Sequence, residues 1–237
     1  MGGFMKSKKE ISKIFFRGPG GSIYTGEIFI NLPKAIKKWL YKIRFVNKLD
    51  VDIKEEICRK SNNNNTAIDC GANVGIWTDI LLQMGYRVVA IEPNKDCYEY
   101  LVERYIGNDK VIVENVALSD YEGKNHFESE HAFSQGGSLN DEPINAERGK
   151  GIEVTVKKLS SYIKEFRPSL VKIDIEGEEI KVINEMLNEL DEKEISNCFF
   201  AVETHERKIV DLDLKIRDIK IEIERRNIEK HFNFNWT

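Results

Sequence analysis

From Thr66 onward, short β-branched runs alternate with helical stretches, and this alternation limits the possible folds more than any other feature of the sequence. The expected strands are residues 67–69, 88–91, 111–113, 170–173 and 198–202, and the expected helices between them are residues 76–84, 96–105 and 178–190. Strands and helices that alternate along a chain usually form a parallel sheet covered by helices. The pattern therefore predicts an α/β domain with a mostly parallel sheet over residues 61–237.

Two parts of this domain depart from the simple alternation. Residues 126–128 and 152–156 alternate like the two strands of an inserted hairpin, and the Gly/Ser/Asn-rich stretch between them, residues 129–151, is expected to be a mobile loop. Residues 209–226 fit both strand and helix spacing, but their length and their many Lys, Glu and Arg residues favour a helix. Phe232, Phe234 and Trp236 then alternate as a final strand.

Residues 1–60 differ from the rest of the chain in charge and in pattern. They contain 14 Lys and Arg against 6 Asp and Glu, which gives a net charge of +8, whereas the rest of the chain carries −12. Residues 6–60 have helical periodicity with one break at residues 18–21, and the spacing of apolar residues predicts an amphipathic basic helix over residues 34–48. We therefore expect a helical N-terminal extension that either binds an anionic partner or packs as a solvated face on the acidic domain.

Composition narrows the class of protein further. Of the 237 residues, 41% are hydrophobic and 32% are charged, as in a globular protein with a charge-rich surface. The longest apolar run, residues 198–202, is much shorter than the ~20 residues that cross a bilayer, so no membrane span is expected. The four cysteines form no CxxC pair, and no signal-peptide stretch precedes the basic residues. These features predict a cytoplasmic protein with free thiols.

The most informative segment is residues 67–77, a strand that leads into a Gly-bearing turn and then a helix, which indicates a nucleotide cofactor. The dinucleotide fingerprint needs a second glycine where this chain has Asn73. Asp69, beside Gly71, would repel a pyrophosphate but attract an ammonium group. Glu92 could accept hydrogen bonds from both ribose hydroxyls of either cofactor. A cationic cofactor therefore fits better than a dinucleotide, and the alternative is a tight turn that binds nothing.

Five motifs together resemble the FkbM family of S-adenosylmethionine-dependent methyltransferases. They span about residues 66–205 and comprise residues 68–75 (IDCGANVG), 91–94 (IEPN), 115–120 (NVALSD, followed by Gly123), 137–139 (GSL) and 171–178 (VKIDIEGE). The last block, placed after a long hairpin, makes the resemblance specific. The family implies a class I methyltransferase fold, Rossmann-like and usually seven-stranded, and O-methylation of hydroxyls on sugars or natural products.

The resemblance and the residue positions together suggest which residues hold S-adenosyl-L-methionine. The expected ligands are Asp69, Gly71, Ala72, Asn73 and Gly75 for the methionine part, Glu92 for the ribose, and Asn115, Val116 and Ala117 for the adenine. Asn73 could instead be only a left-handed turn residue. Cys70 is expected to be a small buried side chain and not a nucleophile.

Two pairs of polar residues follow the last two core strands and would meet at the carboxyl edge of a parallel sheet. They are Asp174 with Glu176, and Glu203 with His205. Methyl transfer to an alcohol needs a base, and we expect His205 in that role, with Asp174 orienting cofactor or acceptor. Glu176 is the further catalytic candidate, unless it only caps a helix that begins at Gly177. The same side chains could bind a divalent ion, but no spacing requires a metal.

These inferences predict an S-adenosylmethionine-dependent O-methyltransferase that acts on a carbohydrate or small-molecule hydroxyl. One alternative is a nucleic-acid methyltransferase whose residues 1–60 follow phosphates, but the sequence has no Asn-Pro-Pro-Tyr block for amino methylation. Another is a cofactor-binding module without catalysis. The chain after residue 226 is short for the usual terminal strand pair, so the sheet edge is either truncated or completed by another subunit in a homo-oligomer.

Overall fold

The computed structural model describes residues 16–17, 23–24, 65–128, 138–140, 151–204 and 212–236. The chain divides into two compact units, residues 1–47 and 48–237. In the first unit, β1 (Phe16–Arg17) pairs antiparallel with β2 (Ile23–Tyr24). The expectation of helix is therefore wrong at these positions, because aromatic and β-branched residues flank a Gly-Pro-Gly-Gly run that interrupts helical periodicity. The amphipathic helix expected at residues 34–48 lies outside the described residues, and the boundary at residue 60 remains a prediction.

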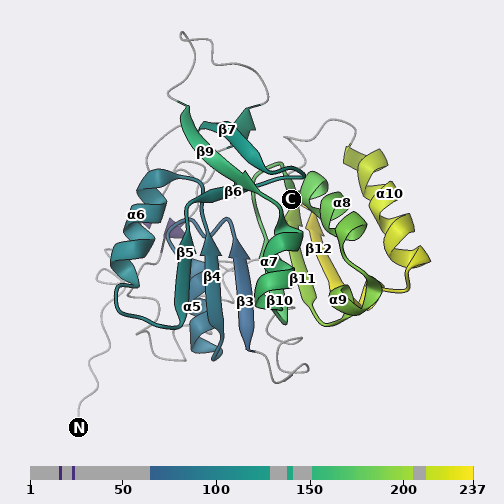
Figure 1. Ribbon diagram of the computed structural model, residues 1–237, viewed down its shortest axis with the longest axis horizontal. Coiled ribbons are helices and arrows are strands. Elements are labelled where there is room, and N and C mark those ends of the chain that lie inside the picture. Colours follow the sequence, from purple (N-terminus) through teal and green to yellow (C-terminus); the bar gives the residue numbers. More distant parts are fainter. Residues whose placement is uncertain are drawn as a thin grey trace. The chain divides into compact units, whose positions relative to one another are not determined.

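The second unit is built on one parallel sheet, in which the described strands follow the order β12-β11-β10-β3-β4-β5. The six strands are β3 (Thr66–Cys70), β4 (Arg87–Ile91), β5 (Val111–Glu114), β10 (Leu170–Ile173), β11 (Phe199–Thr204) and β12 (Phe232–Trp236). Within this sheet, β3 is central and comes first in the sequence. The strands β4 and β5 follow on one side of β3, and β10 then pairs with its other side (Figure 1). Ligands of such sheets bind beyond the carboxyl ends of the strands at this switch point. The predicted Rossmann-like α/β fold is confirmed.

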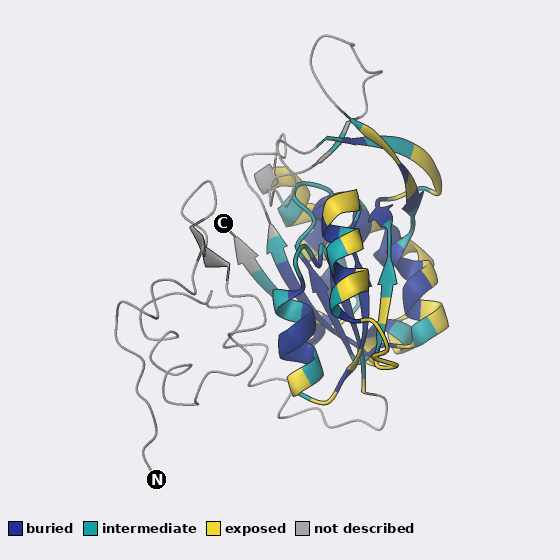
Figure 2. Ribbon diagram, turned by 90° about the vertical axis from the view of Figure 1, so that its left-hand side faces the viewer, coloured by how far each residue is buried: buried dark blue, intermediate teal, exposed yellow. Residues whose placement is uncertain are grey.

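Helices cover both faces of the sheet. They are α5 (Ile76–Gln83), α6 (Lys95–Arg104), α7 (Leu159–Phe166), α8 (Glu179–Glu189), α9 (Glu192–Ser196) and α10 (Leu212–Arg225). Ile68 and Val171 pack with apolar residues of α7, α8 and α10 on one face, whereas Ala67 and Val88 pack with Leu81 of α5 on the other. Figure 2 shows the buried residues concentrated in the strands and on the inner sides of the helices.

The inserted hairpin is part of a second, four-stranded sheet with the order β6-β9-β7-β8. Its strands are β6 (Val116–Leu118), β7 (Gly123–Glu128), β8 (Ser138–Asn140) and β9 (Ile152–Lys157). The antiparallel pairing of β7 with β9, in which His126 is opposite Glu153, confirms the predicted hairpin. Residues 129–151 are not loop throughout, however, because β8 pairs with β7 and brings Leu139 against the small core formed around Phe127.

The end of the chain also follows the prediction, since α10 and then β12 occupy the stretches expected to be helix and strand. Two helices were not predicted: α7 and α9 have only eight and five residues, so the periodic signal of each is short. The described sheet has six strands where the family resemblance implied seven. None of the helices in the described part of the chain is both long and apolar enough to span a membrane.

Candidate active site

The turn from β3 to α5 requires glycine at its first position. Gly71 has a φ of 77°, and a Cβ atom there would lie 1.9 Å from the backbone oxygen of Asp174. The backbone N–H groups of Gly71 and Ala72 both donate to the Ile91 carbonyl, each at 3.0 Å. The turn is therefore fixed directly against the ends of the two neighbouring strands, β10 and β4.

The second glycine of the turn is enclosed by α6. Gly75 has a φ of 84°, and a Cβ there would lie 2.6 Å from the Tyr105 hydroxyl. That hydroxyl lies 2.8 Å from Asp79 Oδ1 and 3.1 Å from the Gly75 carbonyl, and Arg104 forms a buried ion pair with Asp79. These contacts hold the start of α5 against α6. Sequence reasoning missed Asp79, Arg104 and Tyr105, because their spacing matches no motif.

Asp69 lies at the end of central β3 and is fully buried. Its Oδ2 atom accepts a hydrogen bond of 2.7 Å from Thr78 Oγ1 in the first turn of α5. Its Oδ1 atom has no hydrogen-bond partner among the described residues, although Lys172 Nζ lies 3.5 Å away. A buried carboxylate oxygen that lacks a hydrogen bond is costly, which is typical of a group that waits for a ligand.

Lys172 is the residue that sequence reasoning missed at the centre of the site. Its side chain is only 2% exposed, and its Nζ atom lies 3.0 Å from Asp174 Oδ2 and 3.3 Å from the Gly71 carbonyl. Burial favours the neutral amine, but Asp174 and Asp69 favour the ammonium more strongly and raise the pKa of Lys172 above its ordinary value. Its position inside an apolar strand between Val171 and Ile173 was the available signal, because a lysine there needs a buried anionic partner.

Glu92, just beyond β4, connects two backbone segments. Its Oε2 atom accepts from the Asn73 N–H at 2.7 Å, and its Oε1 atom accepts from the Asn94 N–H at 2.8 Å. Burial raises the pKa of Glu92 to about 7, although both hydrogen bonds favour the carboxylate. Asn115 Nδ2 donates to the carbonyls of Glu92 and Pro93 at 2.9 and 3.0 Å. The expected methionine, ribose and adenine segments are therefore joined to one another.

The segment after β10 has a strained backbone. Glu176 has a φ of 58° and Gly177 a φ of 115°, and α8 begins only at Glu179. The expected helix start at Gly177 is wrong, because Glu178 is the N-cap of α8 and that cap has no side-chain hydrogen bond. Glu179 accepts from the N–H groups of Ile175 and Gly177, at 3.3 and 2.9 Å. Glu176 itself is half-buried. Positive φ at a non-glycine residue is expensive and concentrates at functional sites.

The remaining predicted residues divide into three groups. Asn73 does occupy the left-handed region, with a φ of 48°, and Cys70 is buried as expected, which raises the pKa of its thiol. The side chain of Val116 is buried in the core between the parallel sheet and its helices, and that of Ala117 is buried in the small cluster around Phe127. His205 lies outside the described residues. Within the described ranges, no three His, Cys, Asp or Glu side chains form a group suited to a metal ion.

The comparisons with known proteins agree with this geometry. The model of the methyltransferase FkbM domain matches residues 69–232, which include the Gly71 turn, Glu92, the inserted hairpin and the segment after β10. A search of curated proteins finds no match to the chain. The family match covers well over half of the chain, so this protein is a methyltransferase and belongs to the FkbM methyltransferase family.

Proposed function

We propose that the chain is an S-adenosylmethionine-dependent O-methyltransferase that acts on a hydroxyl of a carbohydrate or small molecule. The observation that carries the proposal is the junction between β3 and β10, where the Gly71 turn lies against Asp174 and where Lys172 joins Asp174 to the buried Asp69. A glycine turn at the switch point of a parallel sheet is where a nucleotide cofactor binds.

The charges at this junction suit a cationic cofactor. Asp69, Asp174 and Lys172 carry a net charge of −1 when all three are ionised, and the buried Asp69 Oδ1 lacks a hydrogen-bond donor among the described residues. An ammonium group could supply that donor. A pyrophosphate would add two or so negative charges beside two carboxylates, which favours S-adenosylmethionine over a dinucleotide.

The cofactor-binding residues follow from these positions. Asp69 and the turn formed by Gly71, Ala72, Asn73 and Gly75 would hold the methionine part, Glu92 the ribose, and Asn115, Val116 and Ala117 the adenine. Each Glu92 oxygen already accepts one backbone hydrogen bond and retains a second lone pair for a ribose hydroxyl. Because the side chains of Val116 and Ala117 are buried, they would contact the adenine through their backbone. When bound, the cofactor supplies an electrophilic methyl group.

The chain itself must remove the proton of the acceptor hydroxyl. We propose His205 as the base, because it directly follows β11 in the sequence, as Asp174 follows β10, and imidazole titrates near neutral pH. Asp174 would orient the cofactor or the acceptor, and Glu176 is the next candidate for the base. The acceptor class is the one that the family resemblance implies.

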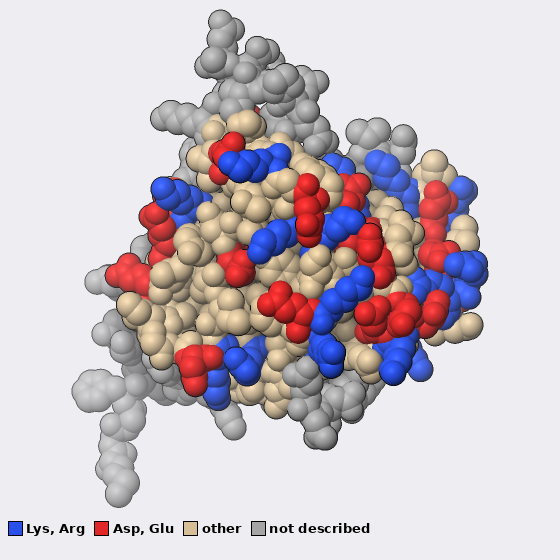
Figure 3. All heavy atoms as spheres, in the orientation of Figure 1, with Lys and Arg blue, Asp and Glu red and all other residues tan. Residues whose placement is uncertain are grey.

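The nucleic-acid alternative gains no support from the face shown in Figure 3. On the face that carries α7, α8 and α10, acidic and basic side chains are interleaved (Figure 3), and ion pairs join Lys158 to Glu189 and Lys181 to Glu178. The described residues of this face therefore form no continuous basic track for phosphates.

Two experiments test the proposal. Incubation of the protein with radiolabelled S-adenosylmethionine and fractionated extract should label a carbohydrate or small molecule, and labelling of nucleic acid alone would contradict it. Calorimetry should show that Asp69→Asn weakens cofactor binding about ten- to hundred-fold, because one charge-assisted hydrogen bond is lost. Wild-type affinity in this variant, or saturable binding of NAD by the parent protein, would refute the cofactor assignment.

The base assignment is tested separately. His205→Ala should lower the rate of methyl transfer about 10²–10⁴-fold with little change in cofactor affinity, and the acidic limb of the pH–rate profile should disappear. Full activity of this variant would remove His205 from the mechanism. If His205 is a metal ligand instead, chelator should silence the parent enzyme and Mg²⁺ or Mn²⁺ should restore it.

A further inference from the structure

Lys172 is a buried lysine for which the surrounding core offers no structural need. Its strand neighbour on the same face is Leu170, its register partner on β11 is Ala201, and the surrounding cluster is apolar. A buried ion pair is often no more stabilising than an apolar side chain of similar size. We therefore look for the reason for this charge among the groups that Lys172 contacts at the carboxyl edge of the sheet.

At that edge, Lys172 contacts three groups that the proposed function assigns to the cofactor. Its register partner on β3 is Asp69, so both side chains lie on the same face, with 3.5 Å between Nζ and Oδ1. Its Nζ atom also lies 3.0 Å from Asp174 Oδ2 and 3.3 Å from the Gly71 carbonyl. One ammonium group thus joins the ends of β3 and β10 to the turn between β3 and α5.

We propose that Lys172 is a positioning residue of the cofactor site, whose ammonium group fixes the Asp69 and Asp174 carboxylates relative to the Gly71 turn. Asp69 is fully buried, and Lys172 supplies the counter-charge that a buried carboxylate needs. Two carboxylates and one ammonium leave one net negative charge, which matches a cationic ligand. The inference rests on the proposed function, because it assigns the ligand to S-adenosylmethionine.

The same contacts exclude a different role for this lysine. A lysine acts as a base or nucleophile only when it is neutral, and such lysines are desolvated without anionic partners. Lys172 has two carboxylates within 3.5 Å and stays protonated. It therefore acts through Asp69 and Asp174 and exchanges no proton itself.

Calorimetry with S-adenosylmethionine on the full chain tests the proposal. Lys172→Met should weaken binding about ten- to hundred-fold, the effect of losing a charge-assisted contact, whereas Lys172→Arg should keep most of the affinity. The matched control is Arg226→Met. It also removes a buried basic group, but Arg226 follows α10 and contacts the end of α8, not the proposed cofactor site. It should lower the melting temperature and leave the affinity unchanged.

A measurement on the wild-type protein keeps the proposal testable even if Lys172→Met does not fold. In lysine labelled with ¹³C next to the ammonium, the Lys172 resonance, assigned with Lys172→Arg, should shift when S-adenosylmethionine saturates the protein. An unmoved resonance, or wild-type affinity in Lys172→Met, would overturn the positioning role and leave the proposed function intact. Failure of the wild-type protein to bind S-adenosylmethionine would overturn both.

Discussion

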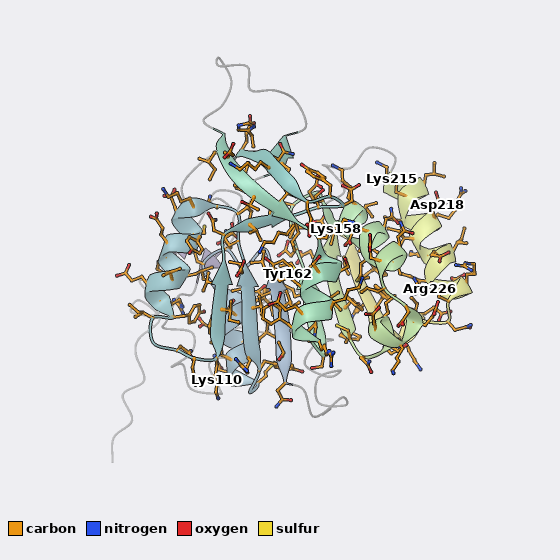
Figure 4. All side chains as sticks on the ribbon, viewed as in Figure 1. Lys110, Lys158, Tyr162, Lys215, Asp218 and Arg226 are labelled. Carbon is orange, nitrogen blue, oxygen red and sulfur yellow. The ribbon has the colours of Figure 1, made fainter. Side chains whose placement is uncertain are left out.

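Lys172 and Arg226 are both basic side chains inside the protein, but they have different kinds of partner. The Arg226 side chain is 7% exposed, and its guanidinium donates to the carbonyls of Leu187 and Leu190 and to Glu192. Arg226 follows α10, beside whose end Figure 4 labels it, and its hydrogen bonds to Leu187 and Leu190 connect it to the end of α8. Lys172 instead contacts two carboxylates and the carbonyl of a glycine turn.

The two sets of partners indicate that Arg226 has a structural role, whereas the fold alone does not require the charge of Lys172. The last carbonyls of a helix have no partner within the helix, so Arg226 satisfies groups that α8 leaves open. Asp69 Oδ1, beside Lys172, by contrast lacks a hydrogen bond among the described residues. We therefore infer that the sheet edge near Gly71 keeps this carboxylate atom for a ligand, whereas the hydrogen bonds of Arg226 complete the end of α8.

The largest predicted loss of stability and cofactor binding is at Gly71, where the turn lies closest to the backbone of β10. Gly71→Ala should destabilise the fold by more than about 4 kcal/mol and abolish cofactor binding, because its Cβ would lie 1.9 Å from the Asp174 carbonyl. Urea unfolding followed by circular dichroism measures the first effect, and calorimetry measures the second.

Gly85 provides the matched control for this prediction. It also has positive φ, at 91°, but a Cβ there would meet nothing within 4 Å. Gly85→Ala should therefore cost only the ~1–2 kcal/mol of left-handed backbone strain and leave cofactor binding intact. Equal losses in the two variants would show that the close approach at Gly71 is unimportant.

Much of the fold could be predicted because its strands and long helices have strong periodicity. After their first residues, Thr66 and Arg87, strands β3 and β4 are apolar except for Asp69, and β10 is apolar except for Lys172. The short strand β8 could not be predicted, since Ser138 and Asn140 have low strand propensity and pair only because β7 offers an edge. Local sequence carries little information about such tertiary pairing.

The site could be predicted only where function leaves a local motif. Gly71, Glu92 and Asp174 lie in such motifs. Arg104 could not be found in this way, because it acts on Asp79 across 25 positions of sequence. Lys172 was within a motif but was not assigned a role, since its partners Asp69 and Asp174 become neighbours only through strand pairing.

The second largest effect should be on catalysis at Asp174. Asp174→Ala removes one acid from the Lys172 cluster and should lower the rate of methyl transfer about 10²–10⁴-fold, because both cofactor and acceptor lose a fixed carboxylate. Single-turnover assays at saturating cofactor separate this loss from weaker binding. The Asp174 side chain is 25% exposed, so the fold should tolerate its removal. Activity close to wild type would place the reaction elsewhere.

The third prediction concerns the structural side of the comparison. Arg226→Met should lower the free energy of unfolding by about 3–6 kcal/mol, because two helix carbonyls lose charge-assisted hydrogen bonds of ~1.5–3 kcal/mol each. Chemical denaturation measures this loss. Arg225→Met is the control: its ion pair with Glu222 is exposed and should contribute under about 1 kcal/mol. If Arg226→Met instead reduced cofactor affinity and left the free energy of unfolding unchanged, Arg226 would have no structural role distinct from that of Lys172.

The smallest predicted effect is the change in stability with pH that Glu92, at the sheet edge near Gly71, should cause. Burial raises its folded pKa to about 7, above the ordinary value of 4.5, so between these values the folded state binds more protons than the unfolded state. Its contribution to stability should therefore be complete below about pH 4 and fall by about 3 kcal/mol as the pH rises to about 7. Cofactor affinity should change in the opposite direction, because ribose hydroxyls donate to the carboxylate. Melting temperatures and cofactor affinities should be measured across this pH range in the wild-type protein and in Glu92→Gln. The difference between the two proteins gives the contribution of Glu92 to each. Identical pH profiles would show that Glu92 does not titrate in this range.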